Sequence, residues 1–124
     1  MEEKIIDEIK TWIDIAEKNY IILKDYLSGA EYNLDDIRGC LHSFKDSLSK
    51  IRYLCKTYWK ARLGKSIDIP IDSLLEQIDT ALFMLEFYSR ERARVIIQFT
   101  LSLSHPKVEE IMALIGLIKI LLSS

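Results

Sequence analysis

Residues 49–65, SKIRYLCKTYWKARLGK, combine six lysine or arginine residues with three aromatic residues and contain no carboxylate. Cations along one face of a helix attract the phosphates of a nucleic acid, and an aromatic ring beside them stacks on a base. On a helical wheel, four cations of this region fall within about 80° of one another, with Tyr53 at their border. This pattern predicts a basic ridge that follows a sugar-phosphate backbone. Its members are Lys45, Arg52, Lys56 and Lys60.

A solvated helix face is the alternative interpretation of the same residues. A long helix of a globular protein needs a solvent-exposed face, and the aliphatic stems of lysine and arginine also cover apolar surface. Two features favour contact with an external anion: like charges four residues apart repel each other, and no acidic residue is interleaved to relieve them. Both interpretations stay open. Arg62 falls on the apolar arc of the wheel, where it needs an acidic partner from the first or third predicted helix.

A second basic cluster, Arg90-Glu91-Arg92-Ala93-Arg94, is predicted to lie in the middle of a helix. Arg90 and Arg94 share a face there, and Glu86 is placed one turn earlier to pair with Arg90. A structural role is therefore one interpretation of this cluster. Nucleic-acid contact by Arg90, Arg92 and Arg94 is the other.

The chain has no motif typical of an enzyme or a metal site. We find no Ser/His/Asp set, no glycine-rich phosphate loop and no spaced His/Glu ligands. His42 and His105 are single, so we expect surface or cap roles. Arg38 and His42 are similar to the Arg and His of helical ribonucleases of the HEPN class, at a shorter spacing. We expect no catalytic residue, no cofactor and no metal.

The two cysteines, Cys40 and Cys55, are predicted to lie in one helix, fifteen residues and some 20 Å apart. They are too distant to form a disulfide, and free thiols are typical of a reducing cytoplasm. The acidic start MEEKIIDEIK does not resemble a signal peptide. The most apolar stretch, residues 111–122, is shorter than the ~20 residues that span a bilayer. We therefore expect a cytoplasmic protein without a membrane partner.

Apolar residues recur at three- and four-residue steps along most of the chain, which predicts helices and no strands. The first helix ends at Leu27. The second runs from Leu34 to Leu63, between Asn33 as N-cap and Gly64 as C-terminal stop.

Asp72 or Ser73 is the predicted N-cap of a third helix, because Ser73 and Glu76 form a capping box. This helix is expected to run to about Leu103 and to bend near Ser89. Its apolar series includes Val95. Ser104-His105-Pro106 predicts the cap and first turn of a fourth helix. The fold prediction is all-α, a compact antiparallel bundle of about four helices in a single helical domain spanning 1–124.

Charge is distributed unevenly along this nearly neutral chain. Residues 1–37 carry four positive and ten negative side chains, a net charge of −6, whereas residues 38–65 carry eight positive and one negative, a net charge of +7. Residues 66–89 have a net charge of −5 and residues 90–124 of +2, which returns the total to −2. The basic segment is thus concentrated in the second predicted helix.

Three segments, WIDIAEKNYIILK, YNLDDIRGCL and LLEQIDTALFMLEFYSRER, resemble the small helical subunit of type III (Csm-type) CRISPR–Cas interference complexes. The resemblance implies a non-enzymatic subunit of a ribonucleoprotein complex in antiviral defence, stacked in several copies along the groove that holds guide and target RNA. It carries over to Arg38 and to Arg90 or Arg92 alone. The implied partners are RNA, other subunits of the complex and neighbouring copies of the chain.

WKARLGK and ERARVII are also similar to helical replication-complex (GINS-type) subunits. A helical protein-protein scaffold, of the GINS type or as a HEPN-like toxin–antitoxin partner, is therefore the alternative function. The predicted RNA-contact residues are Arg38, Lys45, Arg52, Tyr53, Lys56, Lys60, Arg90, Arg92 and Arg94.

Overall fold

The chain forms five α-helices in a computed structural model, which describes residues 2–88 and 90–123. They are α1 (Glu2–Leu27), α2 (Leu34–Leu63), α3 (Asp72–Met84), α4 (Arg90–Ser102) and α5 (Val108–Leu122). No strand occurs in the two described ranges, so the predicted all-α class is confirmed. The expected number of about four helices is one too few.

Helix α2 has the bounds that its caps predict. The Asn33 side chain accepts a hydrogen bond from the backbone N–H of Asp35 at 2.8 Å. At the other end Gly64 has a φ of 70°, and its N–H donates to the Lys60 carbonyl at 3.0 Å. Glycine takes this left-handed conformation without the Cβ strain of other residues, so the helix ends there.

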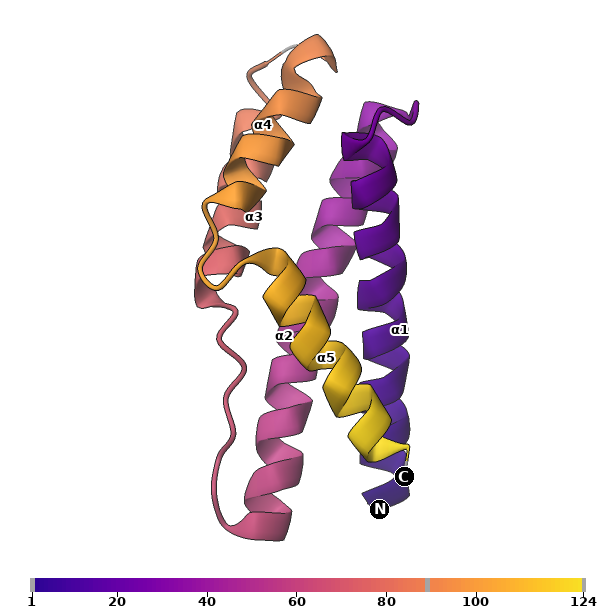
Figure 1. The fold of residues 1–124 in the computed structure, drawn as a ribbon, viewed down its shortest axis with the longest axis vertical. Helices are drawn as coiled ribbons and strands as arrows, with labels where there is room; N and C mark the ends of the chain where they lie inside the picture. The colour runs from indigo at the N-terminus through magenta and orange to yellow at the C-terminus, as the bar shows by residue number, and fades with distance from the viewer. Residues whose placement is uncertain (1, 89, 124) are drawn as a thin grey trace.

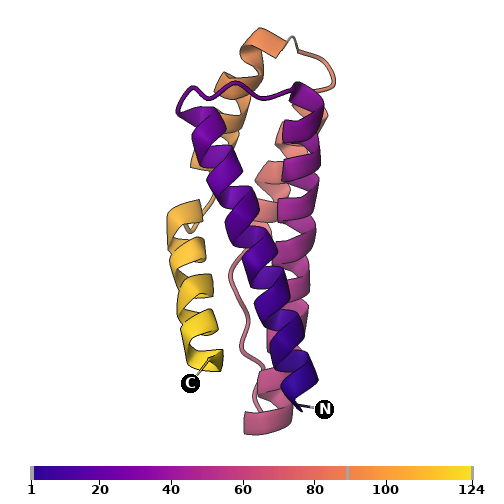
Figure 2. The same ribbon diagram turned by 90° about the vertical axis from the view of Figure 1, so that its right-hand side faces the viewer.

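Helices α1 and α2 form an antiparallel hairpin that runs most of the length of the molecule (Figures 1 and 2). The apolar stripes of the two helices face each other, since Ile9 and Ile13 of α1 and Leu41 and Phe44 of α2 are all inaccessible to solvent. The hairpin also places the acidic N-terminal half of α1 beside the basic C-terminal half of α2.

The predicted third helix is wrong as one element, because the chain reverses after Met84. Turns follow at residues 85–88, and α4 then runs back beside α3 (Figure 1). The predicted bend at Ser89 lies outside the described residues. Helix α3 runs antiparallel to α2 and reaches the first turns of α2 at Leu85. If α3 continued as a straight helix, it would extend beyond the N-terminal end of α2. The reversal instead lets α4 bury Ala93 and Ile97 completely.

The predicted caps of the later helices are also corrected. Ile71 is the N-cap of α3 and makes no side-chain capping bond. The Ser73 hydroxyl instead accepts a hydrogen bond from the His105 N–H at 3.0 Å, so it joins the start of α3 to the α4–α5 connection. Pro106 precedes α5 rather than lying in its first turn, and the buried Ser104 hydroxyl donates to the Leu101 carbonyl at the end of α4.

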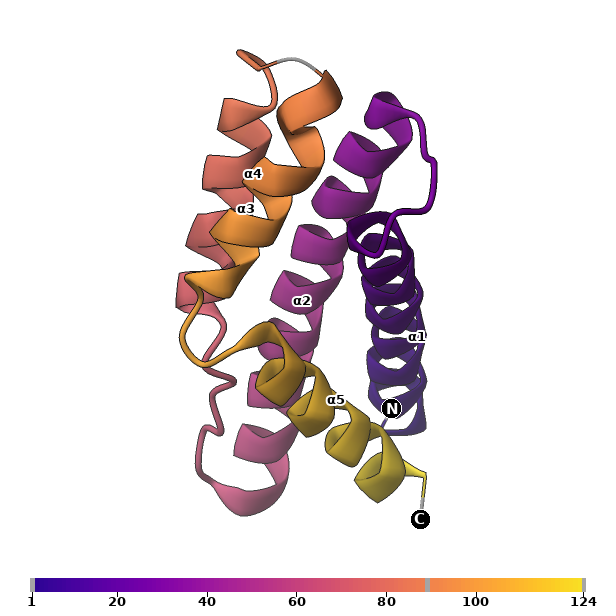
Figure 3. The same ribbon diagram turned by 45° about the horizontal axis from the view of Figure 1, so that its top comes forward.

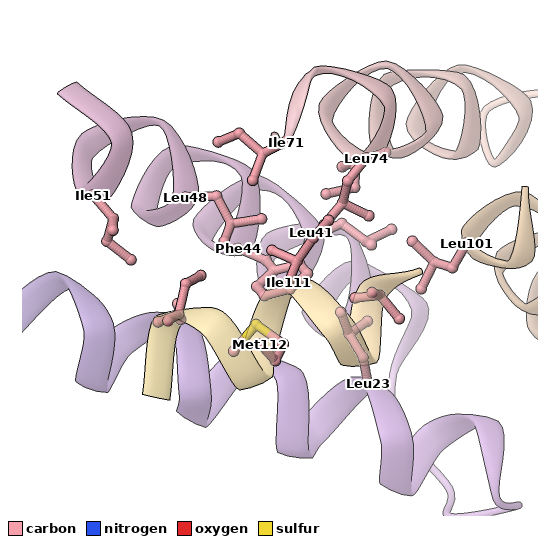
Figure 4. Close-up of a cluster of buried hydrophobic side chains, with 14 of the residues drawn as sticks. Leu23, Leu41, Phe44, Leu48, Ile51, Ile71, Leu74, Leu101, Ile111 and Met112 are labelled. Atoms are coloured by element: carbon pink, nitrogen blue, oxygen red, sulfur yellow. The ribbon is translucent and has the colours of Figure 1, made fainter. Parts of the chain in front are cut away.

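One hydrophobic core joins all five helices (Figure 4). Helix α5 crosses the α1–α2 hairpin obliquely (Figure 3) and contributes Ile111 and Met112 to this core. The connection from α2 to α3 adds Ile69 and Ile71, both almost fully buried. The core therefore holds α2 in one orientation and determines which of its cations face solvent.

Candidate nucleic-acid interface

The apolar arc of α2 is buried as the wheel predicts. Its aliphatic members, Leu41, Leu48 and Ile51, are at most 1% exposed, and Tyr58 is 7% exposed. Trp59 is partly buried against the core. Tyr53 is 67% exposed, so it is the one aromatic residue of the 49–65 segment that is free to stack on a base.

Three cations of α2 are held against α3. They are spaced seven residues apart, about two helical turns, and so follow one line along the helix. The pairs are Arg38 with the Leu85 carbonyl (2.7 Å), Lys45 with the Asp79 carboxylate (2.5 Å) and Arg52 with the Asp72 carboxylate. We call these three pairs the α2–α3 ladder. Half of the predicted basic ridge is therefore occupied by intramolecular contacts.

Arg38 differs from Lys45 and Arg52 because it has a second contact within α2. Its guanidinium also pairs with Asp35 at 3.0 Å, one turn earlier in α2. The bond to the Leu85 carbonyl satisfies a backbone acceptor just beyond the C-terminus of α3, where carbonyls lack helical partners. Arg38 thereby joins the first turns of α2 to the C-terminal end of α3.

The other half of the ridge, Lys56 and Lys60, is exposed to solvent. Lys50, three residues before Tyr53, borders that ring on the side away from the ridge and is also exposed. None of these three lysine side chains makes a hydrogen bond or ion pair with the residues that the structure describes. We call Lys50, Tyr53, Lys56 and Lys60 the exposed strip.

Lys50 is absent from the residues predicted for RNA contact. On the wheel, Tyr53 separates Lys50 from the basic ridge. A prediction based on cations that share one narrow helix face therefore does not include Lys50. Its spacing of three residues from the exposed tyrosine is the signal that would have identified it, because such residues are neighbours on a helix surface. Asp46, one turn before Lys50, bounds the strip with a negative charge.

Arg62 has the acidic partner that its place on the wheel predicts, and of the first and third helices it is the first that supplies it. Its guanidinium pairs with Glu2 of α1 at 2.6 Å, donates to the Tyr58 hydroxyl at 3.0 Å and lies 5.6 Å from the centre of that ring. The Tyr58 hydrogen bond and then the Glu2 charge raise the pKa of Arg62. Its side chain is 54% exposed, however, so Arg62 lies at the edge of the core rather than within it.

The arginines of the second cluster separate into two kinds. Arg94 donates from Nε to the Tyr26 carbonyl at 2.6 Å and from Nη2 to the Ala30 carbonyl at 3.0 Å, with its guanidinium 4.7 Å from the Tyr26 ring centre. It therefore joins α4 to the end of α1. Arg90 and Arg92 are exposed. The predicted Glu86–Arg90 pair is wrong, because Glu86 lies in the turn before α4 rather than one turn earlier in the same helix.

The strip lies along the C-terminal half of α2, whereas the second cluster follows the α3–α4 turn, which lies near the N-terminal end of α2. Arg38, which contacts Leu85 beside the α3–α4 turn, precedes Lys56 by 18 residues of continuous helix, about 27 Å at 1.5 Å per residue. The predicted RNA-contact residues therefore do not converge on one site.

The described residues hold no group of histidine, cysteine and acidic side chains that would bind a metal ion. Cys40 and Cys55 are buried free thiols, and burial raises their pKa values from 9.0 to about 11 and about 12. Their neutral form is therefore favoured, which opposes a nucleophilic role. His42 and His105 are exposed.

Comparison with known proteins assigns no relationship to the chain. No family model, no curated protein and no solved structure matches it. Among the described residues, no helix combines the length and the apolar character needed to cross a membrane. The arrangement defines an all-α protein with a strip of unpaired lysines around an exposed tyrosine.

Proposed function

We propose that this protein is a small helical assembly subunit that binds RNA through the exposed strip of α2. The observation that carries the proposal is the pairing pattern along α2. Lys45 and Arg52 are paired with carboxylates of α3, whereas Lys56 and Lys60 have no described acidic partner and follow an exposed aromatic ring along α2. Unpaired cations beside a stacking residue are typical of surfaces that hold single-stranded nucleic acid.

The proposed mechanism of binding is independent of RNA sequence. The three lysines neutralise phosphates and release condensed counterions, while Tyr53 stacks on an unpaired base. Phosphate contacts position a nucleic acid without reading its bases. This behaviour suits a subunit that accommodates many RNA sequences.

The resemblance to type III (Csm-type) CRISPR–Cas small subunits supplies the proposed context. In that context the strip lines the groove for guide and target RNA, other subunits and copies of the chain adjoin it, and the protein performs no catalysis. The all-helical fold agrees with this context but is common to many protein classes.

RNA affinity measured against salt tests the proposal. The double variant Lys56→Glu, Lys60→Glu is expected to weaken binding of a fluorescent single-stranded RNA at least tenfold, in anisotropy titrations at several salt concentrations. The log–log salt slope should become shallower by about 1.4, because each lost single-strand phosphate contact removes roughly 0.7. Tyr53→Ala should weaken binding without changing the slope.

Lys4→Glu, Lys18→Glu provides the matched control, since both lysines are exposed on α1 and have no described ion pair. This variant makes the same change in net charge and should bind RNA as the unaltered protein does. Equal losses in the two double variants would show that net charge, not the strip, governs binding. No binding by the unaltered protein at low salt would exclude the RNA function.

A protein scaffold of the GINS type, or a HEPN-like toxin–antitoxin partner, is the second candidate. It is favoured by the α2–α3 ladder, in which carboxylates of a neighbouring helix already pair with this side of α2. In that case the strip meets an acidic protein surface. The unaltered protein would then bind no RNA, and the strip variant would lose its protein partner.

A further inference from the structure

A groove lies between the C-terminal parts of α1 and α4, at the start of α5. Figure 1 shows the positions of these three helices. It has a volume of about 550 Å³ and is lined by the C-terminal halves of α1 and α4 and by the first turn of α5. A second hollow of about 430 Å³ shares Leu27, Gln98 and Ser102 with it and extends along α4. The two hollows form one groove.

The floor of the groove is apolar, and its α4 wall carries two exposed apolar residues beside the polar Gln98 and Ser102. Leu23, Leu101 and Val108 are buried beneath it. On the wall, Val95 is 69% and Phe99 63% exposed, one helical turn apart. Val95 belongs to the series that predicts a buried stripe, yet the reversal at the α3–α4 turn leaves it facing outward. An apolar groove with exposed walls is a common docking surface for a helix.

Three cations line the groove, and none is paired with a carboxylate of the described residues. Lys24 lies over the Tyr20 ring at 5.3 Å, Lys107 donates to the Ser102 carbonyl at 2.6 Å, and Arg94 donates to backbone carbonyls. Glu109 is the single acidic residue among the described lining residues. The groove therefore complements an apolar surface that has negative charges at its edges.

We propose that this groove binds an acidic amphipathic helix of a partner protein. From Arg94 to Ser102 the α4 wall extends about 12 Å, which matches about two turns of a bound helix. Apolar residues of the partner at positions i, i+3 or i+4, and i+7 contact Leu27, Val95 and Phe99, while its carboxylates reach Lys24 and Lys107. None of these residues belongs to the exposed strip, so the groove is independent of RNA binding.

Selection from a phage-displayed library of random 16-residue peptides tests the proposal. The selected peptides are expected to be acidic and to have the apolar i, i+3/i+4, i+7 spacing. Synthetic copies should bind the unaltered protein in anisotropy titrations, and Val95→Glu and Lys24→Glu should each weaken that binding at least tenfold. Both altered residues are exposed, and circular dichroism melting confirms that each variant is folded.

Ile120→Glu on α5 and Lys18→Glu on α1 are the controls. Ile120 is 68% exposed, closely matching Val95, and neither control residue lines the groove. Both variants should bind the selected peptides normally. Basic or uncharged selected peptides, no selected peptide, or equal weakening by the controls would overturn the proposal. So would sedimentation showing a dimer that Val95→Glu dissociates, because the occupant would then be a second copy.

Discussion

At the scale of single residues, cations of the same chemical type have different roles because of what packs opposite them. Lys45 and Lys56 lie on similar angles of α2, yet Lys45 pairs with Asp79 of α3 and Lys56 forms no ion pair with a described residue. In the Lys45–Asp79 pair, the Lys45 side chain is 34% exposed and the Asp79 side chain is 55% exposed. Exposed ion pairs add at most about 1 kcal/mol, so the ladder fixes the register of α3 more than it adds stability.

The Arg94 contacts predict a structural role that its neighbour Arg92 lacks. Arg94→Ala removes two charge-assisted hydrogen bonds to carbonyls and the Tyr26 ring contact, and should lower the free energy of unfolding by about 2–3 kcal/mol. Arg92→Ala, on the exposed side of the same helix, should change it by no more than about 0.5 kcal/mol. Urea denaturation measures both values. Equal effects would contradict the assignment of Arg94 as the link between α4 and α1.

The buried thiols predict low reactivity in the folded protein. A rise in pKa from 9.0 to about 11 for Cys40 lowers the thiolate fraction at pH 8 roughly 100-fold, and the rise is larger for Cys55. Reaction with a disulfide reagent such as DTNB at pH 8 should therefore be at least roughly 100-fold slower before than after denaturation in urea. Two fast-reacting thiols in the folded protein would contradict the buried positions of both cysteines.

The same thiols contribute a defined pH dependence of stability. Their folded pKa values are raised, so their contribution is fully present below pH 9 and is lost as the pH rises toward about 11 and about 12, because only the unfolded thiols ionise in that range. The double variant Cys40→Ala, Cys55→Ala should lose less stability between pH 8 and pH 10.5 than the unaltered protein. Urea midpoints at the two pH values make the comparison.

At the scale of elements, two glycines of α2 should respond in opposite directions to alanine. Gly39 lies inside the helix with no atom within 4 Å of an added Cβ, so Gly39→Ala should stabilise the protein by about 0.5–1 kcal/mol. Gly64 also has space, but its φ of 70° makes Gly64→Ala cost about 1–2 kcal/mol. Thermal or urea unfolding measures both. A stabilising Gly64→Ala would contradict the left-handed C-cap.

The bounds of α2 were predictable because both ends depend on neighbouring residues, Asn33 and Gly64. A bend near Ser89 is predicted, but a full reversal between α3 and α4 has no comparable local signal, since residues 85–88 contain no glycine or proline and the apolar spacing continues through them. The cause of the reversal is tertiary packing. Helix α3 reaches the beginning of α2 at Leu85, so the residues that follow can pack against the core only if the chain folds back. Distant packing of this kind cannot be derived from local sequence patterns.

The candidate site was predictable in part for the same reason. The wheel orients α2 correctly from its own residues, which predicts the exposed Tyr53, Lys56 and Lys60. It cannot show that Asp72 and Asp79 lie opposite Arg52 and Lys45, because that depends on the position of α3 along α2. Lys56 and Lys60 are what remains of the ridge after this tertiary pairing, and with Lys50 and Tyr53 they form the exposed strip.

At the scale of the whole molecule, folding offsets much of the charge separation along the chain. The antiparallel hairpin brings the acidic start of α1 to the basic end of α2, where Glu2 and Arg62 pair at 2.6 Å. Lys119 of α5 likewise pairs with Asp14 and Glu17 of α1, at 2.6 and 3.0 Å. The proposed RNA binding is therefore expected to depend on the arrangement of the exposed strip rather than on the net charge of a segment.

The shared core predicts that all five helices unfold together. Trp12 in α1 and Trp59 in α2 are the two tryptophans of the chain, so fluorescence reports on the hairpin, whereas far-ultraviolet circular dichroism reports on every helix. In urea the two signals should have the same midpoint, as in a two-state transition. Phe44→Ala, which removes a fully buried ring, should cost about 3–5 kcal/mol and shift both midpoints equally. If α3 and α4 formed a separate unit, the circular dichroism signal of helices would persist after the fluorescence transition. Phe44→Ala would then shift the fluorescence midpoint more than the circular dichroism midpoint.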